Sequence, residues 1–224
     1  MANFKYIIFA LFIAAASCGT RHNARSYSNS PEISDHFGKP KDSLTFYFPQ
    51  STDPDSGFLK TYSPILHSFG EPILYNYYLN KDVYRFLWLR SFDKPVVFIL
   101  TKLNDQVTLT TKVLEKLEVP DIEKVGDTFI AVQADRKGDI LYNKTKALTL
   151  KNWDAFEQLI QQASFWERPV HSGGITGKDG IVRIMEGHLR DRYWFVENHS
   201  INNIFQEAEI YLIKLSGLRG MINW

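Results

Sequence analysis

Glu186, His188, Glu197 and His199 are the residues whose types and spacing could bind a metal ion. They form two E-x-H pairs in two predicted strands that flank the charged turn Arg190-Asp191. Side chains alternate along a strand, so each pair shares a face. A two- or four-residue loop puts all four on one face, whereas a three-residue loop separates the pairs. Two imidazoles and two carboxylates are a ligand set for zinc or non-haem iron. The alternative interpretation is a solvent-facing surface of cross-strand polar pairs.

Arg85 and Arg90 flank Trp88 within a predicted strand that is otherwise too apolar to be exposed. One interpretation is a binding site for an anion or other ligand, formed by Arg85, Trp88 and Arg90, because the guanidinium fork matches carboxylate and phosphate geometry. The other is structural: each arginine pairs with a buried carboxylate such as Glu186, or stacks on an aromatic ring. The structural interpretation is favoured, since an unpaired buried charge is costly.

No other segment carries a recognisable catalytic signature. The glycine-rich stretch 172–180 lacks the order of a phosphate-binding loop, because Asp179 follows Lys178, and it is expected to be a flexible connection. The catalytic residues therefore remain unknown. Lys and Arg number 26 against 25 Asp and Glu, and no basic run is present, so nucleic-acid binding is not expected.

The amino terminus has the pattern of a signal peptide, expected to span residues 1–17. Lys5 precedes an apolar run of eleven residues, YIIFALFIAAA, which is too short to cross a bilayer core of about 30 Å. Ala15-Ala16-Ser17-Cys18 resembles the lipobox of bacterial lipoproteins, although Ala15 stands where leucine is usual. The resemblance implies that Cys18, the only cysteine, carries acyl chains such as palmitate. Acylation at one residue by several chains gives a stable membrane anchor.

The rest of the chain predicts a flexible tether over residues 18–39 and one α+β domain over 40–224. Strands are recognised by β-branched and aromatic residues, and helices by apolar residues at helical spacing. We expect an antiparallel sheet, a meander followed by a C-terminal hairpin, packed against two amphipathic helices. Residues 63–79 are ambiguous, because Pro64, Gly70 and Pro72 interrupt their apolar residues. The predicted strands are 44–48, 84–90, 95–103, 106–117, 129–134, 139–150, 181–189 and 192–199. The first predicted helix is 152–163, with Asn152 as its N-cap. The second is 204–215, with a capping box formed by Asn203 and Gln206 and a C-cap at Gly217.

Two segments of the domain resemble a widespread, functionally uncharacterised bacterial family of lipoprotein-like proteins. The first is residues 84–96, YRFLWLRSFDKPV. The second runs from Phe165-Trp166 through Asp179-Gly180 and Glu186-Gly187 to Leu215-Ser216-Gly217-Leu218. Arg183 stands where that family's D-G-x-x-W-x-x-E-G pattern has tryptophan. The resemblance implies one continuous fold and supplies no catalytic residue.

These observations predict a lipid-anchored protein of the bacterial cell envelope with a non-enzymatic binding or scaffolding domain. The outer membrane is favoured, because Gly19 is not the aspartate that signals inner-membrane retention. Its partners would be the membrane, through the lipid, and an envelope protein or small ligand. No cofactor is expected. The alternative is a metal-dependent envelope hydrolase that uses zinc or iron at the hairpin Glu/His residues.

Overall fold

The computed structural model describes residues 31–218 except 43, 53–56, 77–78, 91–92, 116–120, 126–127, 133–137, 173–180, 191 and 200–203, and describes no side chains over 116–137. The signal peptide, Cys18 and most of the tether lie outside the described residues. The helices are α1 (Gly57–Ser68), α2 (Leu150–Gln162) and α3 (Gln206–Ser216), with short 3₁₀ helices η1 (Gln50–Thr52) and η2 (Phe165–Glu167). The strands are β1 (Asp82–Arg90), β2 (Val96–Leu103), β3 (Gln106–Leu114), β4 (Asp121–Val125), β5 (Thr128–Val132), β6 (Ile140–Leu148), β7 (His171–Ser172), β8 (Ile181–Leu189) and β9 (Arg192–Asn198).

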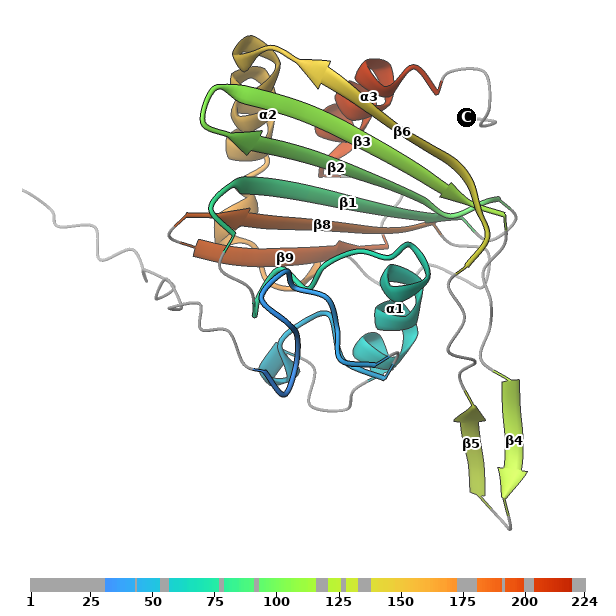
Figure 1. Ribbon diagram of the computed structural model, residues 1–224. Coiled ribbons are helices and arrows are strands. Elements are labelled where there is room, and N and C mark those ends of the chain that lie inside the picture. Colours follow the sequence, from blue (N-terminus) through green and yellow to red (C-terminus); the bar gives the residue numbers. More distant parts are fainter. Residues whose placement is uncertain are drawn as a thin grey trace, which may run out of the picture.

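The fold is built on one seven-stranded sheet in the order β6-β3-β2-β1-β8-β9-β7 (Figure 1). Its first six strands are antiparallel, and the two-residue β7 pairs parallel to β9. The β2–β3 hairpin turns through Asn104-Asp105, where Asn104 takes a positive φ of 53°, a conformation that asparagine tolerates better than most residues. The predicted α+β class, with its antiparallel sheet, is confirmed.

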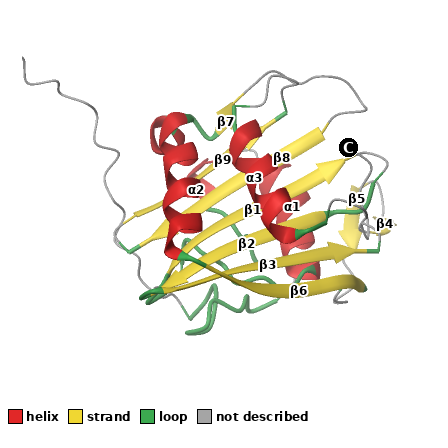
Figure 2. Ribbon diagram, turned by 90° about the horizontal axis from the view of Figure 1, so that it is seen from above, coloured by secondary structure: helices red, strands yellow, loops and turns green. Residues whose placement is uncertain are grey.

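The sheet is covered on both faces, which gives the domain two hydrophobic cores. Helices α2 and α3 pack on one face, where Trp153, Phe156 and Leu212 are completely buried against strand residues such as Phe98 (Figure 2). Helix α1 and the residues before it cover part of the other face, where they pack against side chains of β1, β2, β3, β8 and β9. Two helices were expected, and they are the pair on the first face. The third described helix, α1, supplies the opposite layer.

Helix α1 resolves the ambiguous segment 63–79 into a helix that ends at Ser68 and an irregular connection to β1. Pro64 lies inside this helix, where its ring removes a backbone donor. The helix forms because the apolar side chains of Phe58, Leu59, Tyr62, Ile65 and Leu66 recur at helical spacing and are buried against the sheet.

Three predictions about individual segments are wrong: one strand, one strand pairing and the end of the tether. Residues 44–48 are not a strand; they approach the sheet as irregular chain in which Tyr47 and Phe48 are fully buried. The strand predicted at 129–134 does not continue the meander, because β5 pairs only with β4, while β3 pairs directly with β6. The end of the tether at residue 39 was placed too late, because Ile33 packs against the α1 core and Gly38 accepts a backbone hydrogen bond from Ile73.

The ends of α2 and α3 follow helix-capping chemistry. Helix α2 has Thr149 as N-cap, not Asn152; Asn152 is instead the partner in its capping box. Helix α3 has Phe205 as its N-cap in place of the predicted Asn203, which lies outside the described residues. Gly217 is the C-cap, as predicted, with a left-handed φ of 79°.

Gly187 on β8 is required by the aromatic residues that pack over it. A Cβ atom at this position would lie 2.9 Å from the rings of both Phe165 and Trp166, and 3.1 Å from the ring of Tyr84. Any larger residue would therefore push η2 away from the sheet.

None of the described helices combines the length and the apolar character needed to cross a membrane.

Candidate functional site

The three residues proposed as a ligand site do not share a pocket, because they lie on opposite faces of β1. Arg85 points toward the α1 layer, where its Nη1 donates to the carbonyl of Pro72 at 2.6 Å. Trp88 belongs to the core beneath α2 and α3. Arg90 lies with Trp88, and its guanidinium carbon is 4.3 Å from the centre of the indole ring.

Arg85 forms a buried ion pair with Glu186 on the neighbouring strand β8. The two residues are direct cross-strand partners, and each has only 1% of its side chain exposed. The Nε and Nη2 groups of Arg85 both donate to Oε2 of Glu186, Nε at 2.8 Å, and the hydroxyl of Tyr193 donates to Oε1 at 2.8 Å. Both carboxylate oxygens of Glu186 are therefore bound within the protein. This is the pairing that the structural interpretation predicts.

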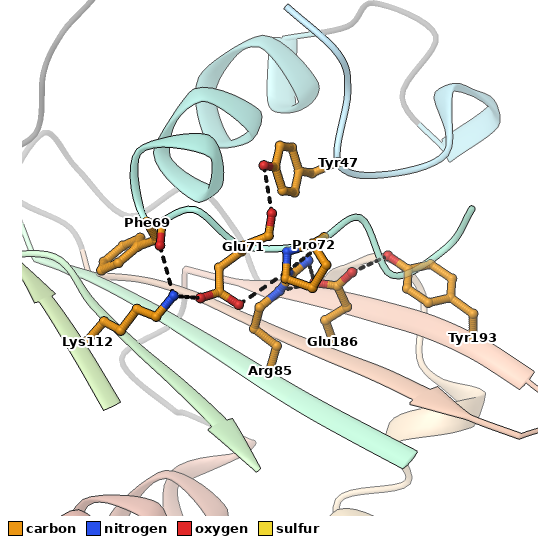
Figure 3. Close-up of polar contacts among 8 residues, drawn as sticks. All are labelled: Tyr47, Phe69, Glu71, Pro72, Arg85, Lys112, Glu186 and Tyr193. Carbon is orange, nitrogen blue, oxygen red and sulfur yellow. Dashed lines mark hydrogen bonds and ion pairs between the residues drawn. The ribbon is translucent and has the colours of Figure 1, made fainter. Parts of the chain in front are cut away.

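A second pair extends this cluster along the sheet, as Figure 3 shows. Lys112 on β3 lies 2.7 Å from Oε1 of Glu71 and donates to the carbonyl of Phe69 at 2.9 Å. The other oxygen of Glu71 is 3.9 Å from Nη1 of Arg85, and its carbonyl accepts from the hydroxyl of Tyr47 at 2.9 Å. Two cations and two anions thus fasten the segment after α1 to the sheet. We name Glu71, Arg85, Lys112, Glu186 and Tyr193 the buried charge cluster.

Electrostatics agree with a charged and permanently paired Arg85. Burial alone would lower the pKa of its guanidinium, but the attraction of Glu186 and Glu71 outweighs burial and raises the pKa above its ordinary value. The same burial raises the pKa of the Tyr47 hydroxyl well above its usual range. Burial likewise raises the pKa of the Glu186 carboxyl, by more than the charge of Arg85 and the hydrogen bonds from Tyr193 and Arg85 lower it.

Arg90 has a more exposed carboxylate partner than Arg85 has. It pairs with Asp93 at 2.8 Å, and that carboxylate is 39% exposed. The Arg90 side chain itself is only 9% exposed. We expect Arg90→Ala to lower the free energy of unfolding by about 1 kcal/mol, because an ion pair whose carboxylate is open to water contributes little and the contact with Trp88 adds roughly 0.5–1 kcal/mol. Chemical denaturation of the variant measures this. A loss above about 3 kcal/mol would show that Arg90 has a buried role like that of Arg85.

The hairpin residues Glu186, His188, Glu197 and His199 follow the two-residue-loop prediction. Leu189 pairs with Arg192, so only two residues form the turn. The side chains of Glu186, His188 and Glu197 are buried on the face covered by α1. The four do not converge at one point, however. Glu186 binds Arg85, and Nδ1 of His188 donates to the carbonyl of Leu74 at 2.8 Å, whereas Glu197 contacts His199 and also His171.

Glu197 lies between two imidazoles, one of which sequence reasoning missed. Its Oε2 is 2.7 Å from Nδ1 of His171, and its Oε1 is 2.6 Å from Nε2 of His199. The hydroxyl of Tyr62 also donates to Glu197. Burial is the main cause that raises the pKa of this hydroxyl, and the negative charge of Glu197 and the hydrogen bond to it raise the pKa further. His171 comes from β7, beside Glu197 in the parallel register, and its side chain is 51% exposed.

This arrangement orients imidazoles and does not form a metal-binding geometry. Distances of 2.6 and 2.7 Å are hydrogen bonds in which a carboxylate accepts, so Nδ1 of His171 and Nε2 of His199 carry protons. Across the described residues, no group of three or more His, Cys, Asp or Glu side chains is placed to hold a metal ion. A carboxylate that fixes a partly exposed imidazole can support proton transfer, although the described residues beside it include no nucleophile in a recognisable arrangement.

No sequence pattern around His171 indicated that it lies beside Glu197. It precedes the glycine-rich stretch that looked like a connection, of which 173–180 lie outside the described residues. Strand β7 is only two residues long, too short for any period to mark it. No protein-family model, no curated protein and no solved structure matches the chain, so the residues themselves are the basis for its function.

Proposed function

We propose that the chain is a lipid-anchored protein of the bacterial cell envelope, acylated at Cys18, whose α+β domain binds or scaffolds a partner and is not an enzyme. The observation that carries the proposal is the order of segments at the amino terminus. One lysine, an apolar run, three small residues and the only cysteine are followed by a polar stretch that leads into a folded domain. The outer membrane is the favoured location.

The geometry of the domain supports a binding function over catalysis. Among the described residues, Arg85 and Glu186 are the most deeply buried arginine, lysine or acidic side chains; they bind each other, and Arg85 also binds the carbonyl of Pro72. They stabilise the contact between the α1 layer and the sheet. These two charged side chains already have partners within the protein, so we expect the domain to recognise its partner through surface residues. An envelope protein or a small ligand is the expected partner.

The alternative, a metal-dependent envelope hydrolase, needs Glu186, His188, Glu197 and His199 in one coordination sphere. Their separate partners disfavour that arrangement, because a ligand already bonded to an arginine or a backbone carbonyl must lose that bond to reach a metal. Stoichiometric zinc or iron in the purified protein, lost on His199→Ala, would favour the hydrolase.

The central test is Cys18→Ala. We expect this variant to lose its acyl chains and to leave the membrane fraction, because lipid at Cys18 is the proposed anchor. Intact-mass measurement and membrane fractionation check the two effects separately. Ser17→Ala is the matched control, since it changes the neighbouring residue to another small one and should keep both the acyl chains and the membrane association. If Cys18→Ala fractionates with membranes as the wild type does, the proposed anchor is wrong.

A further inference from the structure

The first part of the described chain exposes two large hydrophobic side chains. Phe37 is 66% exposed and Leu44 is 68% exposed. Among the large hydrophobic residues of the described ranges, these are the two highest exposures, and the next is Leu141 on β6 at 58%. Both residues precede the first helix, on the segment of chain that leads from the tether into the domain. Two strongly exposed hydrophobic residues seven positions apart on this segment make it a candidate interaction surface.

The backbone around Phe37 is a closed and well-bonded loop. An isolated bridge joins Ser34 to Pro40. Within it, Oδ1 of Asp35 accepts hydrogen bonds at 2.9 Å from the backbone of both Phe37 and Lys39. Gly38 has a positive φ of 77°, and its carbonyl accepts from Ile73 at 2.7 Å. Phe37 therefore stands at the tip of a loop that is fastened to the domain.

Leu44 is presented by a second turn of the same kind. Oδ1 of Asp42 accepts from the backbone of Leu44 at 3.0 Å and from the hydroxyl of Thr45 at 2.9 Å. The chain then becomes fully buried at Tyr47 and Phe48. The turn is thus held at both ends, and Leu44 cannot fold back into the core without breaking it. We name residues 33–42 and 44–45, with these two tips, the N-terminal double loop.

The double loop is the first part of the domain after the proposed anchor in the chain, which favours the membrane as its occupant. About 20 residues separate Cys18 from Phe37, and an extended chain spans at most about 3.5 Å per residue, so the loop stays within roughly 70 Å of the lipid. Tethering gives a high effective concentration at the bilayer, where even a weak contact is populated. A soluble partner has no such advantage.

The charges of the loop fit an interfacial contact driven by apolar burial. Lys39 and Lys41 are exposed and carry long side chains that can reach the headgroups. Asp35 and Asp42 balance them and are bonded to the backbone. The near neutrality implies little dependence on anionic lipid. Burial of each tip in the interface favours the docked state by about tenfold.

We propose that Phe37 and Leu44 insert into the interfacial layer of the bilayer that carries the anchor, and so orient the domain on the membrane. This inference rests on the proposed lipidation of Cys18. It adds that the double loop, and not the lipid alone, contacts the membrane.

The test uses the full lipidated chain in phosphatidylethanolamine/phosphatidylglycerol vesicles, with a single introduced cysteine in Phe37→Cys, Leu44→Cys or Leu141→Cys. Acylated Cys18 does not react, so a nitrobenzoxadiazole label reports one site. Leu141, exposed on the edge strand β6, is the matched control. We expect labels at 37 and 44 to shift to the blue, to brighten at least twofold, and to be quenched by nitroxide-labelled lipids, while the label at 141 behaves as in water.

Several outcomes overturn the inference. Labels at 37 and 44 that match the label at 141 would show that the loop stays in water. A blue shift without quenching by nitroxide lipids would show contact with protein instead of lipid. Failure of the proposed function looks different: intact mass would lack acyl chains, a second label would appear at Cys18, and the protein would not sediment with vesicles.

Discussion

Replacement of Arg85 by alanine is expected to lower the free energy of unfolding by about 3–5 kcal/mol. The change leaves Glu186 fully buried with only Tyr193 as a donor, and leaves the carbonyl of Pro72 without the guanidinium. An unpaired buried carboxylate is far more costly than the loss of an exposed ion pair. Since a domain is typically stable by 5–15 kcal/mol, the variant would lose a large share of its stability. Urea denaturation followed by circular dichroism measures the change.

The double variant Arg85→Leu/Glu186→Leu is the control for this mechanism. It removes both charges at once, so no carboxylate remains unpaired, and it should recover part of the loss seen in Arg85→Ala. Comparison with Arg90→Ala, expected to lose only about 1 kcal/mol, separates the arginine whose carboxylate partner is buried from the one whose partner is partly exposed. A loss below about 1 kcal/mol in Arg85→Ala would contradict the structural role, and would make an anion site at Arg85 the better interpretation.

The strand pattern of the sheet was predictable because its signals are local. Alternation of apolar residues and the turn at Asn104-Asp105 mark β2 and β3, and the turn at Arg190-Asp191 marks β8 and β9 within one residue of their ends. The two-residue loop then determines which side chains of the hairpin share a face. The helices α2 and α3 were equally visible, since their apolar residues keep a period of 3.6 over several turns.

The order of the strands and the partners of the site residues were not predictable, because they depend on distant contacts. Arg85 meets Glu186 only because β8 pairs with β1, which joins positions 101 residues apart. The sequence offered Glu186 as one acceptable carboxylate among many. Likewise, His171 reaches Glu197 through a two-residue parallel strand with no periodic signal. The hairpin register therefore put Glu186, His188 and Glu197 on one face, while long-range pairing gave Glu186 and His188 partners outside the hairpin and added His171 to the contact between Glu197 and His199.

Local propensity also failed where tertiary burial outweighed it. Pro64 has the lowest helix propensity of any residue type, but the burial of one apolar face stabilises α1 more than the proline destabilises it. In residues 44–48, apolar residues imitate a strand, yet the backbone N–H of Tyr47 donates to the hydroxyl of Ser63 on α1 instead of to a neighbouring strand. In both places the deciding contact comes from the opposite layer of the fold.

The buried His188 makes the stability of the domain depend on pH. The imidazole is fully buried, and burial lowers its pKa below the usual value more than the hydrogen bond to the Leu74 carbonyl and the charge of Asp82 raise it. The folded protein therefore binds a proton at His188 less readily than the unfolded chain, whose histidine has a pKa of about 6.5. Above that pH both states are neutral at this residue, so the full stability is present.

As the pH falls below about 6.5, the unfolded chain gains a proton at this position that the folded protein does not, and stability must fall. We expect His188 alone to contribute a slope of up to about 1.4 kcal/mol per pH unit, which ends once the pH passes the lowered pKa of the folded state.

Denaturation curves at pH 7.5, 6.5, 5.5 and 4.5 measure the slope. His188→Asn is the matched variant, because its amide can donate to the Leu74 carbonyl in place of Nδ1 but does not titrate. The other histidines remain in both proteins, so the difference between the two slopes isolates His188. Parallel slopes in the wild type and in His188→Asn would mean that the buried imidazole is protonated as readily in the fold as in water, and that its burial does not set the acid limit of this domain.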